Sequence, residues 1–228
     1  MLWSLEAVRD NIRNRDGKRV FYLAQGDQLT SSARDYLTAQ RIEILPAAQA
    51  RPQRYRLQGG GWMEEKPEHM THLNGDTLVP KTHPRIVFRG AMDTLEAELL
   101  LSQLEVSDPI RKDLGEVLAL ARDLVRWEVL GEPVEDRKLC GLTQQEQRLH
   151  SHRPQDFYGQ PHFMPQYTDG MAILQLNRAR CAARAAELAA ARAFTDEEGN
   201  VTRPDLLRAL NRMSSMIWIL MIRLKKDT

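Results

Sequence analysis

The segment from Met171 to Phe194 contains neither glycine nor proline and is rich in alanine, with leucines at 174, 176 and 188. Glycine and proline are the residues that interrupt helices, and alanine is the best helix former, so this composition predicts one long helix. We expect the rest of the chain to be organised around that helix. Cys181 is assigned to its apolar side.

One stripe of the predicted helix carries charge. Arg180, Arg184 and Glu187 follow each other at spacings of four and three, which places them on one helix face. Two guanidiniums beside a carboxylate can grip a polyanion that also carries hydrogen-bonding groups. The alternative is a solvated face with internal ion pairs, which is the commoner use of such a stripe.

The front of the chain has a different character. A short helix over 2–12, a strand over 18–24, a helix capped by Ser31 or Ser32 and a strand over 41–45 predict a small α/β module. The stretch 47–61 contains Pro52 and three consecutive glycines, which predicts a linker. We therefore assign residues 1–60 to an N-terminal extension.

The stretch 62–84 is polar, interrupted by prolines and rich in histidine, and predicts a long loop with a short strand at Thr77–Val79. Beyond it the periodicity is helical, and residues 85–228 are assigned to a bundle. The expected helices cover 85–104, 109–130, a short segment after an N-cap at Thr143 with Glu146 in a capping box, 170–194, and a fifth capped by Thr202. A loop is expected over 150–169.

Composition excludes several classes of protein. The 42% hydrophobic and 28% charged residues are ordinary for a globular chain, and the formal net charge of +1 gives no global attraction to nucleic acid or an anionic membrane. Two cysteines argue against a disulfide framework. The most apolar run, 216–222, is too short to span a bilayer, and the first residues lack a signal-peptide pattern. These features predict a cytoplasmic protein.

Three further positions carry candidate chemistry. Asp93 lies among apolar residues of the first bundle helix, where an acid needs a partner, and Arg180 on a facing helix is the natural one. Asn211 adjoins the apolar end of the fifth helix and must find hydrogen bonds. Lys81 precedes the first bundle helix, where a cation and a helix N-terminus together can hold phosphates.

Five segments together resemble the ATP:cob(I)alamin adenosyltransferases, and most closely the ethanolamine-utilisation type within the propanediol-utilisation-type superfamily. They are KPEHMTHL (66–73), VPKTHPRI (79–86), FRGAMD (88–93), RCAARAAE (180–187) and LNRMS (210–214). Their order and spacing agree with the family over about two-thirds of the chain. The front module also resembles the ethanolamine-type N-terminal extension.

The resemblance implies a mainly α, five-helix bundle that assembles as a homotrimer with active sites between subunits. It implies transfer of the adenosyl group of ATP, carried with Mg²⁺, to the cobalt of cob(I)alamin. In it Arg184 would neutralise the leaving triphosphate, Glu187 and Asn211 would hold adenosine and ribose, and Arg180 paired with Asp93 would fix the subunit interface. The stretch 61–84 would bind substrate.

Within that stretch, the resemblance implies that Lys66, Thr71 and Lys81 hold phosphates. It also implies an aromatic residue under the corrin near His162-Phe163-Met164-Pro165, where Phe163, with Met164 beside it, is the first candidate. An alternative makes Phe163 a loop anchor in the core. Partners would be microcompartment proteins or an adenosylcobalamin-dependent ammonia-lyase, which would place the protein in the cytoplasm, in association with a microcompartment.

The chain departs from the family in three places. Many ethanolamine-type enzymes carry a His followed by a Cys-Cys-x-x-Cys metal cluster, but here no cysteine precedes Cys140. His69, His72 and His83 alone are a weak metal signal, so no metal site is predicted. Ser215 stands where propanediol-type members often have Asp, and their Gly-Asp-rich nucleotide loop is reduced to KPEHMTHL.

Rival functions make different demands on the sequence. A non-catalytic corrinoid-binding bundle or carrier would share the fold, and it predicts corrinoid binding without ATP turnover. A ferritin-like di-metal protein would need two Glu-x-x-His motifs on bundle helices, and a P-loop enzyme would need GxxxxGK[ST]; the sequence contains neither arrangement.

Overall fold

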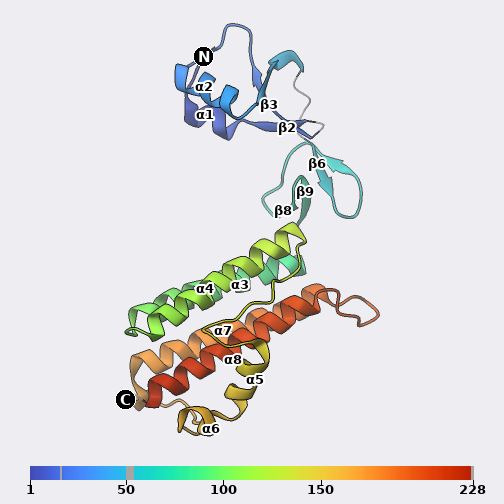
Figure 1. Ribbon diagram of the computed structural model, residues 1–228. Helices are drawn as coiled ribbons and strands as arrows, with labels where there is room; N and C mark the ends of the chain where they lie inside the picture. Colours follow the sequence, from blue (N-terminus) through green and yellow to red (C-terminus); the bar gives the residue numbers. More distant parts are fainter. Residues whose placement is uncertain (16, 50–53, 227–228) are drawn as a thin grey trace. The chain divides into compact units, whose positions relative to one another are not determined.

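The computed structural model describes residues 1–15, 17–49 and 54–226 (Figure 1). Its internal contacts divide the chain into two compact units, Met1–Arg54 and Tyr55–Thr228. Each unit has its own core, and each is described by itself.

The first unit is a small α/β module. A three-stranded sheet has the order β2-β3-β5, with β3 antiparallel to β2 and parallel to β5, and a separate parallel pair joins β1 to β4. Its elements are β1 (Leu2–Trp3), α1 (Leu5–Asp10), β2 (Arg13–Arg15), β3 (Lys18–Leu23), β4 (Gln28–Leu29), α2 (Ser31–Ala39), β5 (Glu43–Pro46) and a 3₁₀ turn, η1 (Ala47–Gln49). The core that holds them together consists of Val8, Phe21, Ala33, Leu37 and Ile42.

The sequence predicted the elements of this unit better than their ends. The strand expected over 18–24 is confirmed as β3, but α2 is capped by Thr30, whose Oγ1 accepts a hydrogen bond from the Ala33 amide at 3.3 Å, and not by Ser31 or Ser32. The first helix is shorter than expected because residues 2–3 pair with β4 as a strand.

The second unit begins with a four-stranded sheet of order β7-β6-β9-β8. The strands are β6 (Tyr55–Leu57), β7 (Trp62–Met63), β8 (Met70–Asn74) and β9 (Thr77–Pro80). The strand expected at Thr77–Val79 is confirmed. The prediction of a long loop around it was wrong, because β7 and β8 form there. Of the predicted linker, residues 50–53 lie outside the described part of the chain, and 55–57 form a strand that pairs in parallel with β9.

The helices follow the predicted pattern except for one short helix over 154–158, which forms within the loop expected over 150–169. They are α3 (Pro84–Leu104), α4 (Ile110–Leu130), α5 (Gln144–His152), α6 (Pro154–Tyr158), α7 (Gly170–Phe194) and α8 (Pro204–Lys226), with a 3₁₀ turn, η2 (Tyr167–Asp169), before α7. The capping box is confirmed, since the Thr143 hydroxyl accepts from the Glu146 amide and the Glu146 carboxylate accepts from the Thr143 amide. The prediction that Thr202 caps the fifth helix was wrong. The Thr202 hydroxyl instead donates to the Phe194 carbonyl at the end of α7, at 2.9 Å.

The central helix α7 packs on α3 and on α8, while α4 packs on α3 and α5 on α8 (Figure 1). The buried side of α7 is a row of alanines at spacings of four, three and four, and such small side chains let neighbouring helices approach closely. The row consists of Ala179, Ala183, Ala186 and Ala190. Cys181 is exposed, so its assignment to the apolar side was wrong.

The expected fold class is confirmed as a mainly α bundle of five principal helices, preceded by a small α/β module. One core cluster extends through the bundle and includes residues of α3, α4, α7 and α8. Within residues 1–15, 17–49 and 54–226, no helix combines the length and the apolar character needed to cross a membrane.

Candidate functional site

The charged stripe of α7 meets α8 at a direct side-chain contact. The Asn211 amide nitrogen donates to the Glu187 carboxylate at 2.8 Å, and both residues are half-buried. One turn before Glu187, Arg184 is exposed, and none of the hydrogen bonds or ion pairs among the described residues engages its guanidinium. An anchored carboxylate–amide pair therefore lies beside an available cation.

Arg212 adds a second cation next to this pair. Its Nη2 donates to the Asn211 side-chain oxygen, so the amide of Asn211 is held between Glu187 and Arg212. Burial lowers the pKa of the Arg212 guanidinium, the positive charge of Arg148 lowers it further, and Glu187 opposes both effects. The arrangement offers acceptors and donors for a polar ligand together with positive charge for its phosphates.

Arg180 belongs to an aromatic cluster. Its guanidinium lies over the Trp218 ring at 5.3 Å from the centroid, and it donates to the Asn177 side chain at 3.2 and 3.3 Å. Phe163 and His162 stack on the same indole, with centroids 5.2 and 5.8 Å away. Trp218 thus ties the loop before α7 to the charged stripe. The adjacent Met164 is 83% exposed.

Sequence reasoning missed Trp218. It lies in the apolar run 216–222 and was assigned no role, although an indole in such a run carries an N–H group that needs a partner. Phe163 is half-buried against the bundle core and faces Trp218, which is compatible both with a loop anchor and with a contact surface for a flat ligand.

The expected placement of Asp93 on the core side of α3 was wrong. Met92 and Leu95 point into the core, and Asp93, one residue along from Met92, is exposed. Within the single described chain, Arg180 bonds to Asn177 and not to Asp93. The expected pair between Arg180 and Asp93 is therefore not formed within the described chain.

The residues expected to bind phosphate gather around the β8–β9 hairpin. Thr71 pairs with Val79 across the hairpin, the Lys81 amide donates to the His69 carbonyl at 2.9 Å, and Lys66 is exposed in the preceding turn. No hydrogen bond or ion pair of the described residues joins this group to Arg184, Glu187 or Asn211. The two groups of predicted site residues are thus without a direct polar contact in the described part of the chain.

A buried charge cluster under this hairpin was also missed. Glu128 of α4 is fully buried, and it receives hydrogen bonds from Arg85 and, at 2.7 Å, from Arg89. Arg89 also donates to the Leu73 carbonyl of β8 at 2.8 Å, which fastens the hairpin to the bundle. The signal was available, because Glu128 follows the core residue Leu124 by four positions and so shares its face.

The arginines of this cluster also affect His83, the residue that caps the N-terminus of α3. His83 is the N-cap, and its Nδ1 accepts from the Arg85 amide at 3.2 Å. Burial lowers the pKa of the His83 imidazole, and the charges of Arg85 and Arg89 lower it further. A neutral ring is the form that can accept this hydrogen bond.

His69, His72 and His83, the histidines considered as metal ligands, are not part of a metal-binding group in the described residues. In the portion of the chain that the structure describes, no cluster of three or more His, Cys, Asp or Glu side chains is arranged to hold a metal ion. The His72 ring instead contacts the Gly75 carbonyl at 3.0 Å and packs edge-on against Tyr55.

A comparison with protein families gives the class of this protein. Residues 62–224 match the model of the cobalamin adenosyltransferase family, and the chain belongs to that family.

Among its relatives, it is similar to the corrinoid adenosyltransferases EutT of Escherichia coli K12, at 32% identity, and of Salmonella typhimurium, at 33%. Both alignments cover 158 residues, which is 69% of this chain and 59% of each relative, so the chain spans under two-thirds of the relatives' length.

Solved structures of PduO-type enzymes are also similar. One is an alanine variant of the ATP:corrinoid adenosyltransferase of Lactobacillus reuteri, complexed with cobalamin and ATP, at 18% identity and a TM-score of 0.47, covering 75% of this chain and 87% of that one. A histidine variant of the same enzyme gives 17% identity and the same TM-score.

Proposed function

We propose that this protein transfers the 5′-deoxyadenosyl group of ATP to the cobalt of cob(I)alamin. In the step, the Co(I) electron pair attacks C5′ of ATP, a Co–C bond forms, and the C5′–O bond breaks. The electron pair of that bond leaves with triphosphate, and the cobalt becomes formally Co(III). The corrinoid supplies the nucleophile, so the protein has to supply position and charge.

The observation that carries this proposal is the Glu187–Asn211 pair beside the exposed Arg184. Glu187 and Asn211 offer an acceptor and a donor for the hydroxyls and base of a nucleoside. Arg184 would neutralise the charge that grows on the leaving triphosphate, an interaction that strengthens in the transition state. Family membership makes ATP and a corrinoid the substrates to test first.

The other half of the site would come from a second copy of the chain. Lys66, Thr71 and Lys81 of one subunit would hold the phosphates, with Mg²⁺ carried by ATP, against the α7 stripe of its neighbour. Asp93 is exposed and Arg180 has no carboxylate partner within the described chain, so the two are available to pair across that interface. We propose a homotrimer with sites between subunits.

The aromatic cluster would receive the corrin. Phe163, backed by Trp218 and flanked by the exposed Met164, presents an apolar surface next to Arg180. An aromatic group under the corrin displaces its lower ligand, and four-coordinate Co(II) is then more easily reduced to the Co(I) nucleophile.

The biological setting is part of the proposal and is supported by the similarity to the EutT enzymes. Because the EutT enzymes are similar to this chain, we place it in ethanolamine utilisation, in the cytoplasm. Its product would supply an adenosylcobalamin-dependent ammonia-lyase, in association with microcompartment proteins. The first unit would either dock onto such a partner or serve as a structural cap.

The first experiment is an anaerobic assay of purified protein with ATP, Mg²⁺ and chemically reduced cob(I)alamin, followed by the visible spectrum of adenosylcobalamin. Arg184→Ala should lower the transfer rate by about 10²–10³-fold, the range for losing one preorganised charge contact. Arg192→Ala is the matched control, since Arg192 is an exposed arginine in the last turn of the same helix. Near-normal turnover of Arg184→Ala would refute the leaving-group role.

The aromatic cluster has its own test. Phe163→Ala should slow transfer that starts from Co(II) much more than transfer from chemically made cob(I)alamin, because the ring acts before the nucleophile exists. Equal losses would move the role to another aromatic residue, such as Phe157 or Tyr167.

A non-catalytic corrinoid carrier is the second candidate function. The observation that favours it is the glycine-poor hairpin segment 66–73, which contains no Gly-Asp-rich nucleotide loop. Tight corrinoid binding without product in the anaerobic assay would support a carrier and contradict the transfer reaction.

A further inference from the structure

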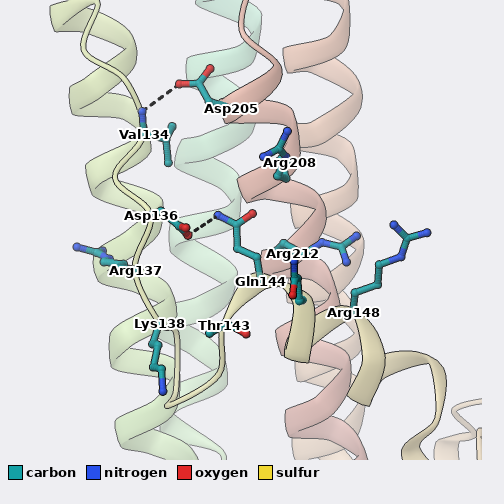
Figure 2. Close-up of a pocket in the computed structure, with 11 residues that line it drawn as sticks. Val134, Asp136, Arg137, Lys138, Thr143, Gln144, Arg148, Asp205, Arg208 and Arg212 are labelled. Atoms are coloured by element: carbon teal, nitrogen blue, oxygen red, sulfur yellow. Dashed lines mark hydrogen bonds between the residues drawn. The ribbon is translucent and has the colours of Figure 1, made fainter.

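A pocket of about 720 Å³ lies between α5, α8 and the segment 131–143 that joins α4 to α5 (Figure 2). Arg208 and Arg212 project into it from α8, and Arg148 comes from α5. Its volume is in the range of small-molecule sites. Arg184, Glu187 and Asn211 do not line it, and Arg212, which donates to Asn211, is the residue that it shares with the proposed substrate site.

The pocket has a surplus of positive charge. Its lining includes the five cations Arg137, Lys138, Arg148, Arg208 and Arg212 against the two carboxylates Asp136 and Asp205. Both carboxylates are already engaged within the protein. Asp205 accepts from the Val134 amide at 3.0 Å and from Arg203 at 2.9 Å, and Asp136 accepts from the Gln144 amide at 3.1 Å.

Most of the cations are not neutralised. Arg137 forms an ion pair with Asp123 at 2.8 Å, whereas the guanidiniums of Arg148 and Arg208 have no hydrogen-bond or ion-pair partner among the described residues. Arg148 and Arg212 are close enough that the charge of Arg148 lowers the pKa of Arg212. Like charges held this close are unfavourable until an anion lies between them.

A buried polar group at the inner end of the pocket also lacks a partner. Gln147 is 1% exposed and lines a small chamber of about 20 Å³ that shares Val134, Arg137, Gln144 and Arg212 with the main pocket. Its Nε2 donates to the Leu142 carbonyl at 3.0 Å, but its Oε1 accepts no hydrogen bond in the described chain. Buried acceptors are normally satisfied, and a chamber of this size can hold one water molecule that would donate to Gln147.

We propose that this pocket binds a polyphosphate group. Three arginines in a concave site recognise phosphate oxygens bidentately, and their combined charge requires more than one anionic group. The volume of the pocket favours a small molecule over a macromolecule. The group can belong to inorganic triphosphate or to a nucleotide, and both carry the same phosphate chain.

The test is calorimetric titration of the full chain with sodium triphosphate at low salt, in an Arg184→Ala background that weakens binding at the proposed substrate site. In that background, adding Arg148→Ala and Arg208→Ala should lower the affinity at least about tenfold, and the paired Lys replacements should retain part of it. Adding Arg192→Ala should leave the affinity unchanged. Because both pocket arginines are exposed, circular dichroism should show an intact fold.

A second titration, with ATP, distinguishes inorganic triphosphate from a nucleotide as the source of the phosphate chain. Equal affinity for ATP and triphosphate indicates that the phosphate chain is the whole ligand. Tighter binding of ATP than of triphosphate indicates that the nucleoside contributes contacts of its own.

Two results would overturn the proposal. One is the same affinity for triphosphate with and without the two pocket arginines. The other concerns adenosyl transfer by the Arg148→Ala/Arg208→Ala protein with Arg184 intact. A loss of activity as large as that of Arg184→Ala would show that the pocket belongs to the substrate site. Failure of the transfer reaction itself would show as no product from the unaltered protein and would leave the titration unaffected.

Discussion

The bundle contains two groups of arginines that the protein uses in opposite ways. Under the β8–β9 hairpin, Arg85 and Arg89 enclose the fully buried Glu128. Between α5 and α8, Arg148, Arg208 and Arg212 surround open space, and the carboxylates nearby are bonded elsewhere. The first group is complete without a ligand, and the second is not.

The difference shows how to separate structural from ligand-binding arginines. A buried carboxylate between two guanidiniums fixes the geometry of the elements that carry them, here α3, α4 and the hairpin. Arginines whose guanidiniums have no carboxylate stay solvated and repel one another, which an arriving anion relieves. Removing a charge should therefore change the stability of the protein in opposite directions at the two groups.

The largest effect is expected at Glu128. Glu128→Gln leaves two guanidiniums facing an uncharged group in a buried site, and we expect the free energy of unfolding to fall by about 3 kcal/mol, in the range for breaking a buried ion pair. Urea unfolding followed by circular dichroism measures it. Glu96→Gln, which removes a pair with Arg122 at 3.0 Å on the surface, is the control and should cost less than about 1 kcal/mol. Similar losses for both variants would remove the distinction between the two groups.

A smaller effect is expected at Asp205, on the rim of the pocket. Burial alone would raise the pKa of this carboxyl, but hydrogen bonds from Arg203 and the Val134 amide outweigh it and lower the pKa to about 2. Since that value lies below the 3.8 of the free group, the stabilisation is complete above pH 3.8 and is lost as the pH falls towards 2. Allowing for solvent screening, Asp205→Asn should cost about 1 kcal/mol near neutral pH.

The pH dependence provides the check on Asp205. Unfolding curves of the unaltered protein and of Asp205→Asn should differ near neutral pH and converge as the solution is acidified. A difference that persists at the lowest pH would show that the side chain acts by packing and not by its charge.

The smallest effect should have the opposite sign. Arg148→Gln removes a charge that opposes Arg212, so we expect the protein to become more stable by a few tenths of a kcal/mol, roughly the scale of exposed charge interactions. Melting temperatures at low salt measure this change, and added salt should reduce it. A destabilised Arg148→Gln would mean that Arg148 already contributes to the structure, as Arg89 does.

Local signals were enough to predict most of the bundle. The helix α7 begins and ends within one residue of its predicted bounds, and the Thr143 capping box forms as expected, because both depend on neighbouring residues. The spacing of Arg180, Arg184 and Glu187 placed the charged stripe correctly. That Asn211 must find a hydrogen bond was also evident, and its partner is Glu187.

What could not be predicted depends on residues far apart in the chain. The strand β6 consists of three residues and pairs with β9 twenty-one positions later, so its own residues carry too short a pattern to predict this pairing. The partners of Glu128, Arg85 and Arg89, lie 43 and 39 residues away on α3. Cys181 was misplaced because alanines occur on every side of α7, which leaves its apolar face poorly defined by sequence.

Because Cys181 is exposed, a dye attached to its thiol can report on changes around α7. The second thiol, Cys140, is a poor target for alkylation, because burial and then the charges of Asp113 and Glu116 raise its pKa and keep it protonated. A maleimide dye should therefore label the free subunit at one position, next to Arg180 and one turn before Arg184. Fluorescence from that dye can follow the arrival of a nucleotide, and protection from labelling can follow the docking of another copy, without any engineered cysteine.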